Sequence, residues 1–366
     1  MKTRHYAYLV LTLFCLLFFS VCSSPAGNGT PFDGYIITGS SGSFTAAKDD
    51  VIIGTGTIQN VIEEIRDHAI GEDCDIQFGN GTTELDIGTD GITFDGSTGW
   101  GVIGLFGKIT SAYDYTINLI NGVYINSKAD IKHTKLGSQT AIINDGGILD
   151  IIGGSVTTTG NGFGIYSGSG NSIITISGGH VSATYTAIHS DSNGSITIKG
   201  GTVSATNIGI SSGGNVLIEI IGGSVSGGTA IYNNGNSPIT ISGGHVSGTI
   251  DWAVFSAGSG TLTISGGTIS VPKNVYAVLY PSGITLGGNP DIMGEIWTMG
   301  DSVTKVVNVN PDFAPGTRQY TIDFYDYVDG KIAVNDGADF LENFALYDSN
   351  YKLEISGNNL VMKAKP

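Results

Sequence analysis

A repeat of about 22 residues occupies the sequence between Leu149 and Ser270. Each copy reads approximately Ile-x-Ile-x-Gly-Gly-x-Val-Ser, followed by a turn, an Ala-Ile pair or its equivalent, and a second turn. A repeat of this length indicates a solenoid, because one such unit cannot bury its apolar face alone and must stack on its neighbours. The first glycines of the pairs give intervals of 25, 22, 22, 21 and 23 residues: Gly153, Gly178, Gly200, Gly222, Gly243 and Gly266.

Four positions of the repeat are aliphatic in every copy, and they predict three short strands per coil. Ile174 and Ile176 represent the first two positions, whose spacing of two residues places both side chains on one face of a strand. Val181 and Ile188 represent the second and third strands, which follow turns. The sequence therefore predicts an all-β protein built as a parallel β-helix solenoid, with coils about 4.8 Å apart.

The regions on either side of the repeat predict different structures. The segment 57–69 has one apolar face, so we expect a helix that covers the open end of the first coil. After residue 290 the repeat is no longer visible, although alternating strands continue. The predicted organisation is a signal peptide at 1–23, a flexible leader at 24–50, an N-terminal cap at 51–74, a β-helix at 75–298, and a C-terminal β cap or small β-domain at 299–366.

The first residues of the chain predict export. Lys2 and Arg4 precede an apolar run at 8–19, which small residues follow, and this is the pattern of a secretory signal. The run is short for a helix that spans a membrane. Cys22 offers lipidation after cleavage as an alternative, although Val21 is larger than the residue that usually precedes such a cysteine. We expect an extracellular or cell-surface protein that contacts a membrane only through such a lipid anchor.

The net charge excludes one class of partner. The formal charge is −16, and removal of Lys2 and Arg4 with the signal peptide would leave −18. Because an acidic protein repels phosphate backbones and other polyanions, we expect no nucleic-acid partner.

The Ile-Ser-Gly-Gly-x-Val-Ser copies, with a helix before them and strands after them, resemble the right-handed parallel β-helix surface proteins of bacteria. This resemblance covers most of residues 50–366. It implies a right-handed coil, and a shape shared with pectate lyases and with the passenger domains of adhesins. A shared shape does not define a function, which depends on the residues placed on it.

The acidic residues do not form the cluster that a lyase or glycosidase of this shape requires. Asp150 and Glu219 occupy equivalent positions three coils apart, which is roughly 14 Å at strand spacing. Paired glycosidase carboxylates lie about 5 to 9.5 Å apart. Asp90 and Asp95 each precede a glycine, which is typical of turns. We expect no catalysis, and a polysaccharide lyase or glycoside hydrolase is the alternative.

The histidines do not predict a metal site. His180 and His245 occupy equivalent outward positions three coils apart, and His189 belongs to a different strand of the coil. The Gly-Gly-x-Gly-x-Asp motif of calcium-binding solenoids is missing from the sequence. We therefore expect neither a metal nor another cofactor.

One row of predicted outward residues suggests a binding surface. Tyr166, His189, Tyr232 and Phe255 each follow an inward Ile or Val of the third strand, so they form an interrupted aromatic strip. Aromatic side chains can stack on sugars or anchor a protein partner, although rings of this kind also pack beneath turns. We expect a non-catalytic binding or adhesion protein whose partner is an extracellular glycan or a surface protein. A structural component of an envelope or fibre is a further alternative.

Overall fold

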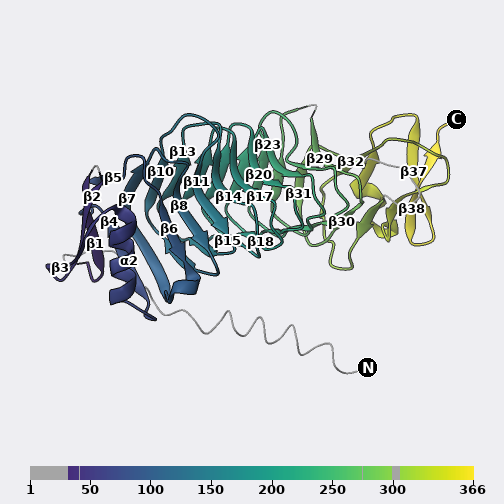
Figure 1. Ribbon diagram of the computed structural model, residues 1–366. Coiled ribbons are helices and arrows are strands. Elements are labelled where there is room, and N and C mark those ends of the chain that lie inside the picture. The colour runs from purple at the N-terminus through teal and green to yellow at the C-terminus, as the bar shows by residue number, and fades with distance from the viewer. Residues whose placement is uncertain (1–31, 41, 274, 299–305) are drawn as a thin grey trace, which may run out of the picture.

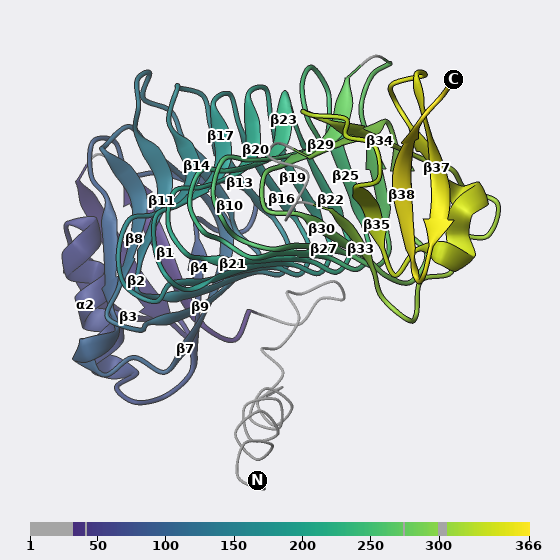
Figure 2. The ribbon, with the colours of Figure 1, turned by 90° about the vertical axis from the view of Figure 1, so that its right-hand side faces the viewer.

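The computed structural model describes residues 32–40, 42–273, 275–298 and 306–366 of the chain. These residues form a parallel β-solenoid of about 11 turns, with about 23 residues per turn. Strands make up 52% of the structure and helices 6%, which confirms the predicted all-β class. The coils stack along one axis, with the helix α2 at the N-terminal end and the hairpin β37–β38 at the C-terminal end (Figures 1 and 2).

Each full coil contributes one strand to each of three parallel sheets. Sheet A contains β4 (Cys74–Phe78), β9 (Tyr124–Ser127), β12 (Ile148–Ile151), β15 (Ile173–Ile176), β18 (Ser195–Ile198), β21 (Leu217–Ile220), β24 (Ile239–Ile241), β27 (Leu262–Ile264), β30 (Ile284–Leu286), β33 (Val307–Val309) and β35 (Ile332–Asn335). Sheet B contains β5 (Glu84–Asp86), β10 (Asp130–His133), β13 (Ser155–Thr158), β16 (His180–Ala183), β19 (Thr202–Ala205), β22 (Ser224–Gly227), β25 (His245–Gly248), β28 (Thr268–Ser270) and β31 (Asp291–Met293).

The remaining strands complete the coils. The long strand β7 (Val102–Ser111) belongs to sheet A in its first half and to sheet B in its second half. Sheet C contains β6 (Ile92–Asp95), β8 (Tyr115–Ile120), β11 (Thr140–Asp145), β14 (Phe163–Ser167), β17 (Thr186–Ser190), β20 (Ile208–Ser212), β23 (Thr229–Asn233), β26 (Val254–Ser256), β29 (Tyr276–Tyr280), β32 (Glu295–Thr298), β34 (Tyr320–Phe324) and β36 (Phe344–Leu346).

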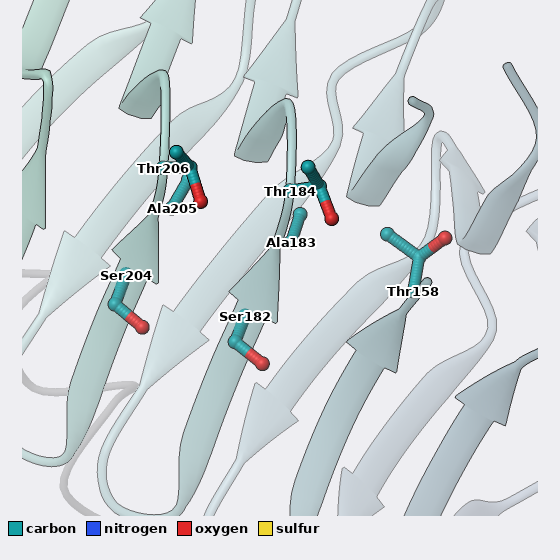
Figure 3. A pocket seen from close by; sticks show the side chains of 7 residues that line it. All are labelled: Thr158, Ser182, Ala183, Thr184, Ser204, Ala205 and Thr206. Carbon is teal, nitrogen blue, oxygen red and sulfur yellow. The ribbon is translucent and has the colours of Figure 1, made fainter. Parts of the chain in front are cut away.

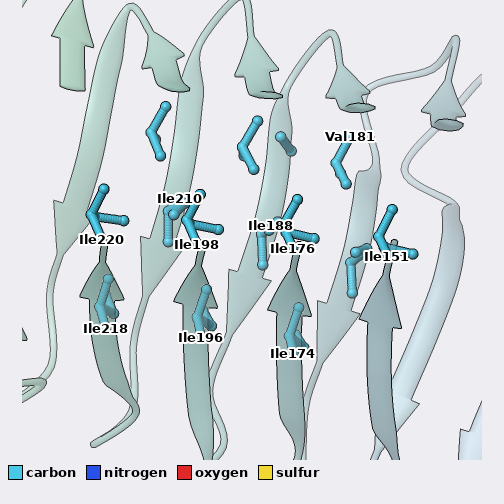
Figure 4. Packing of buried hydrophobic residues seen from close by; sticks show 14 of the residues in the cluster. Ile151, Ile174, Ile176, Val181, Ile188, Ile196, Ile198, Ile210, Ile218 and Ile220 are labelled. Carbon is cyan, nitrogen blue, oxygen red and sulfur yellow. The ribbon is translucent and has the colours of Figure 1, made fainter. Parts of the chain in front are cut away.

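The predicted aliphatic columns form the core. Ile174 and Ile176 of β15, Val181 of β16 and Ile188 of β17 are all fully buried, with exposed fractions of 0 or 1%. Each lies in register with its counterpart in the next coil, as Ile174 does with Ile196. Figure 4 shows these side chains stacked in rows inside the solenoid. Burial of identical aliphatic groups in successive coils fixes the register, since a slip of one residue would turn every one of them outward.

The core also contains a polar seam that the predicted columns do not include. From β11 to β32, the residue two positions after the inward aliphatic residue of each sheet C strand is also buried, although it is hydrophilic in most coils. Buried polar groups usually have hydrogen-bond partners. Asn233 Nδ2 donates to Ser256 Oγ at 3.3 Å, whereas Ser167 Oγ and Thr298 Oγ1 are buried without a partner among the described residues. The seam consists of Asn144, Ser167, Ser190, Ser212, Asn233, Ser256, Tyr280 and Thr298.

The N-terminal cap is larger than the sequence predicts. The strands β1 (Tyr35–Ser40), β2 (Ser43–Lys48) and β3 (Val51–Gly56) form an antiparallel extension of sheet A, because β1 pairs with β4. The prediction of a flexible leader at 24–50 is therefore wrong for 35–48, where alternating residues such as Tyr35 and Phe44 are buried. Residues 24–31, the predicted signal peptide and Cys22 lie outside the described residues.

The helix α2 (Ile58–His68) confirms the predicted cap. Thr57 is its N-cap and accepts a hydrogen bond from Asn60 N at 3.2 Å. Ile58, Ile62 and Ile65 join the continuous core, so the helix closes the end of the solenoid. In the part of the chain that the structure describes, no helix is long and apolar enough to cross a membrane.

The coils extend past the predicted boundary at residue 298. β33 and β35 continue sheet A, and β34 and β36 continue sheet C, all by parallel pairing. The predicted boundary at 299, between the β-helix and a C-terminal β cap or small β-domain, therefore falls within the solenoid, where buried rings such as Tyr320 and Phe344 join the aliphatic core while the strand pairing persists. The 3-10 helix η2 (Ala338–Asn343) and the antiparallel hairpin of β37 (Tyr351–Ser356) and β38 (Asn359–Ala364) follow, and β38 pairs with β35.

Candidate functional site

The four predicted binding residues lie in one outward column of sheet C. The strand register pairs Tyr166 with His189 and Tyr232 with Phe255. Ser211 occupies the coil between the two pairs. Each of the four aromatic side chains is half-buried, whereas the preceding isoleucine or valine is fully buried. The structure therefore brings these four residues together on one face, as two pairs.

The rings within each pair stack on each other. The ring centroids of Tyr166 and His189 are 5.7 Å apart and their planes differ by 6°. Those of Tyr232 and Phe255 are 5.0 Å apart, at 12°. Stacking follows from the fold, because in-register positions in adjacent coils are about 4.8 Å apart along the axis. Offset-stacked aromatic pairs contribute about 0.5–1.5 kcal/mol beyond the area they bury.

Four further rings, which the sequence did not predict, lie on the same face. Phe163 stacks on His189 at 4.8 Å and Trp252 lies 4.7 Å from Phe255, each from the position three residues before the column. Tyr276 stacks on Trp297 at 5.0 Å, further along the sheet. A sequence signal exists for Trp297, which directly follows the inward Ile296 just as Tyr166 follows Ile165. We call these eight rings the aromatic ladder: Phe163, Tyr166, His189, Tyr232, Trp252, Phe255, Tyr276 and Trp297.

Polar groups lie beside the two ends of the aromatic ladder. His189 Nε2 is 3.2 Å from Asp191 Oδ2. Burial raises the pKa of Tyr166, and the nearby carboxylates of Asp191 and Asp145 act in the same direction. At the other end, burial and the hydrogen bond that Tyr276 donates to Asp323, at 2.8 Å, raise the pKa of Tyr276 to about 12. Both tyrosines therefore carry neutral hydroxyl groups at physiological pH.

The stacking determines which parts of the rings a partner can reach. Because Tyr166 and His189 face each other, as do Tyr232 and Phe255, each ring hides at least one of its faces against a neighbour. The outward edges and the hydroxyl groups remain available. From Tyr166 to Trp297 the ladder crosses six coil intervals, a length of roughly 29 Å at strand spacing. The surface is thus a long row of ring edges.

Sheet B offers a shallow groove of a different kind. It has a volume of about 350 Å³ and runs across three coils at the ends of β13, β16 and β19. Only hydroxyl and methyl groups line it, and Figure 3 shows them in repeating positions from coil to coil: Thr158, Ser182, Ala183, Thr184, Ser204, Ala205 and Thr206. Without a charged or aromatic side chain, the groove has little with which to hold a particular ligand.

The strand register also places the acidic and histidine residues that the sequence analysis considered. Asp150 and Glu219 occupy one column of sheet A, with Thr175 and Thr197 between them. His180 and His245 occupy one column of sheet B and are likewise three coils apart. No group of three or more His, Cys, Asp or Glu residues that could hold a metal ion occurs within the described ranges.

Three comparisons with known proteins, against family models, curated sequences and solved structures, found no match.

Proposed function

We propose that this chain is an exported, non-catalytic binding or adhesion protein, and that the aromatic ladder is its contact surface. The observation that carries this proposal is the set of half-buried rings, interrupted at Ser211, on one face of a solenoid whose other outward columns hold mostly short polar residues. Tyr and Trp side chains are enriched among the residues that dominate binding energy at interfaces. The resemblance to bacterial β-helix surface proteins and the basic-apolar N-terminus support export.

The geometry favours a protein partner over a glycan. A sugar stacks on the flat face of a ring, and in the ladder the faces are largely covered by neighbouring rings. A protein surface can pack apolar side chains against ring edges and accept hydrogen bonds from the hydroxyls of Tyr166 and Tyr232. A ladder of roughly 29 Å also matches the dimensions of a protein interface rather than those of one sugar.

Simultaneous substitution of Tyr166, Tyr232 and Phe255 by Ala tests this proposal. Because central aromatic side chains each contribute about 2 kcal/mol or more to an interface, we expect binding to weaken by at least about 100-fold. Binding of the labelled full chain is measured on a panel of intact bacterial and animal cells and on a glycan array. Treatment of the cells with protease should abolish binding, as expected for a protein partner.

The matched control carries three substitutions on sheet A, Thr175→Ala, Thr197→Ala and Thr240→Ala. These residues share an outward column in the same part of the solenoid. The control should bind as the unmodified chain does, with circular dichroism confirming that both variants fold. If the folded aromatic variant binds cells normally, the aromatic ladder is not the contact surface. If binding survives protease treatment and follows the glycan array instead, the partner is a glycan.

A further inference from the structure

A second cavity lies at the N-terminal end of the solenoid, away from the aromatic ladder. It has a volume of about 230 Å³ and separates α2 from the beginning of sheet C. Glu63 and Arg66 line it from the helix, and Asp95, Trp100 and Ile120 line it from the first coils. Sugar-binding sites commonly combine an aromatic ring with a few directed polar groups, as ligand pockets in general do.

The walls of the cavity are held in place by the surrounding structure. Gln59 joins the helix to β6, because its side chain accepts a hydrogen bond from Thr93 N at 2.9 Å and donates one to Thr93 O at 3.2 Å. Trp100 packs edge to face against the buried Phe94, with ring centroids 5.6 Å apart. A cavity with fixed walls binds a ligand without the cost of ordering them.

Negative charge exceeds positive charge around the cavity. Asp95 Oδ1 accepts hydrogen bonds from Asn121 and Ser97, which lower the pKa of Asp95, so this carboxyl is ionised at neutral pH. Arg66 is paired with Asp67 at 2.7 Å. Among the residues that line the cavity, Glu63 and Asp95 are acidic and Arg66 is basic, while Asp67, which pairs with Arg66, does not line it.

Two carboxylate oxygens remain for a ligand. Asp95 Oδ2 and Glu63 Oε2 form no hydrogen bond with any described residue, whereas Glu63 Oε1 accepts a hydrogen bond from Gln59 at 3.3 Å. Carboxylates bind an ammonium group through charge-assisted hydrogen bonds. The cavity thus pairs an aromatic, apolar side with an acidic side.

We propose that this cavity binds a single amino-sugar ring. The ammonium group would lie between Glu63 and Asp95, and the apolar side of the ring would pack against Trp100 and Ile120. The volume of about 230 Å³ is below the roughly 300–1,000 Å³ of sites for drug-sized ligands, which suits one ring and not an oligosaccharide. This proposal does not rest on the proposed function of the aromatic ladder, because the two sites share no residue.

The test measures binding of three monosaccharides that differ in charge. The chain contains three tryptophans, and the substitutions Trp252→Phe and Trp297→Phe leave only Trp100. The tryptophan fluorescence of this double variant therefore reports on the cavity. Titration of this full-length double variant with glucosamine should change the emission with an affinity on the order of millimolar, as expected for so small a ligand. Glucose should bind more weakly and glucuronate should not bind, because the carboxylates repel its negative charge.

Substitution of single helix residues provides the control. Glu63→Gln should weaken glucosamine binding by about tenfold or more, because it removes one charged hydrogen-bond acceptor. Glu64→Gln, on the adjacent exposed position outside the cavity, should leave the affinity unchanged. The variant lacking Tyr166, Tyr232 and Phe255 should still bind glucosamine. Equal binding of glucuronate and glucosamine, or no response to glucosamine, would overturn the proposal.

Discussion

Asp150 shows how the position of one side chain in the solenoid changes its chemistry. It lies in the outward column of sheet A, where Oδ2 accepts a hydrogen bond from Ser177 Oγ at 3.0 Å. Its other oxygen, Oδ1, is buried and has no hydrogen-bond partner among the described residues. Burial therefore raises the pKa of Asp150, and the opposing effects of Ser177 and Lys199 are smaller. Folding therefore shifts this carboxyl toward its protonated form.

This shift predicts a pH dependence of stability. A carboxyl whose pKa is raised by folding stabilises the folded state below its ordinary pKa of about 3.9, and that contribution is lost as the pH rises through the folded pKa. Asp150→Asn should therefore increase the free energy of unfolding at pH 7 by about 0.5–1 kcal/mol, and the increase should vanish near pH 3. Thermal unfolding of both proteins at several pH values measures the difference.

A suitable control is Glu219→Gln, which removes a negative charge from the same column of sheet A. Because the chain carries a net charge of −16, removal of any carboxylate reduces general repulsion. The gain from Asp150→Asn should exceed that of the control at pH 7. If Asp150→Asn is no more stable than Glu219→Gln, the buried oxygen does not destabilise the fold.

For individual residues, the sequence predicted the face of the strand on which each lies better than it predicted the side chains that each contacts. Alternation placed Tyr166 and Phe255 on the outer face of a strand, and the structure confirms this. It did not show that Phe163 and Trp252, three positions earlier, reach the same rings. Two consecutive residues are buried between the two positions, Gly164 and Ile165 in one case and Ala253 and Val254 in the other, so a simple period of two does not describe these segments.

At the scale of the element, the glycine pair is the part of the repeat with the strictest requirement. The second glycine of each pair has a left-handed backbone, with φ of +66° at Gly201. A Cβ atom there would also lie 2.5 Å from Gly178 O of the preceding coil. A left-handed backbone by itself favours glycine, and the close approach of the preceding coil adds a second reason for it.

We expect Gly201→Ala to destabilise the protein by about 3 kcal/mol or more. The left-handed backbone alone costs an L-residue about 1–2 kcal/mol, and the contact with Gly178 adds to this cost. Gly122→Ala is the control, because Gly122 has φ of +77° but a methyl group there would have no atom within 4 Å. Denaturant unfolding measures both. Equal losses in the two variants would show that the contact between coils is unimportant.

The last coils show where the repeat pattern in the sequence no longer indicates the fold. In the regular coils an isoleucine, valine or leucine occupies each of the four aliphatic columns, so the period is visible in the sequence. In the last coils, inward aliphatic residues such as Ile322 persist, but large rings such as Tyr320 and Phe324 join them in the core, and longer loops connect the strands. Parallel hydrogen bonding does not depend on side-chain identity. The architecture therefore continues where its sequence signature is lost.

At the scale of the whole molecule, the two ends of the solenoid are covered differently. The N-terminal end carries α2 and the antiparallel strands β1, β2 and β3. The C-terminal end carries the hairpin β37–β38, in which Leu360 and Met362 are fully buried (Figure 2). An uncovered parallel sheet would expose unpaired backbone groups that pair readily with another chain. These caps favour separate molecules over a fibre formed by stacking of solenoid ends.

Removal of the hairpin tests this interpretation. Deletion of residues 350–366 exposes β35 and the apolar groups beneath Leu360 and Met362, so the shortened chain should associate. Light scattering should report a monomer for the chain without residues 1–23 and larger species for the deletion variant. Circular dichroism shows whether the solenoid persists. As the control, Lys363→Ala breaks the 2.9 Å pair with Asp329 but keeps the hairpin. A folded, monomeric deletion variant would contradict the prediction.

The sequence by itself determined the solenoid, its three strands per coil, its aliphatic columns and its capping helix. These features are local and periodic, so alternation and spacing record them directly. Only the tertiary structure decided the stacking of rings from neighbouring coils, the polar seam, the true ends of the coils and the cavity beside α2. Each of these features involves residues that lie about one coil or more apart in the sequence, such as Glu63 and Asp95. Each therefore depends on how the coils and the helix pack against one another. The repeat therefore fixes the scaffold, whereas packing between its units creates the surfaces that can bind.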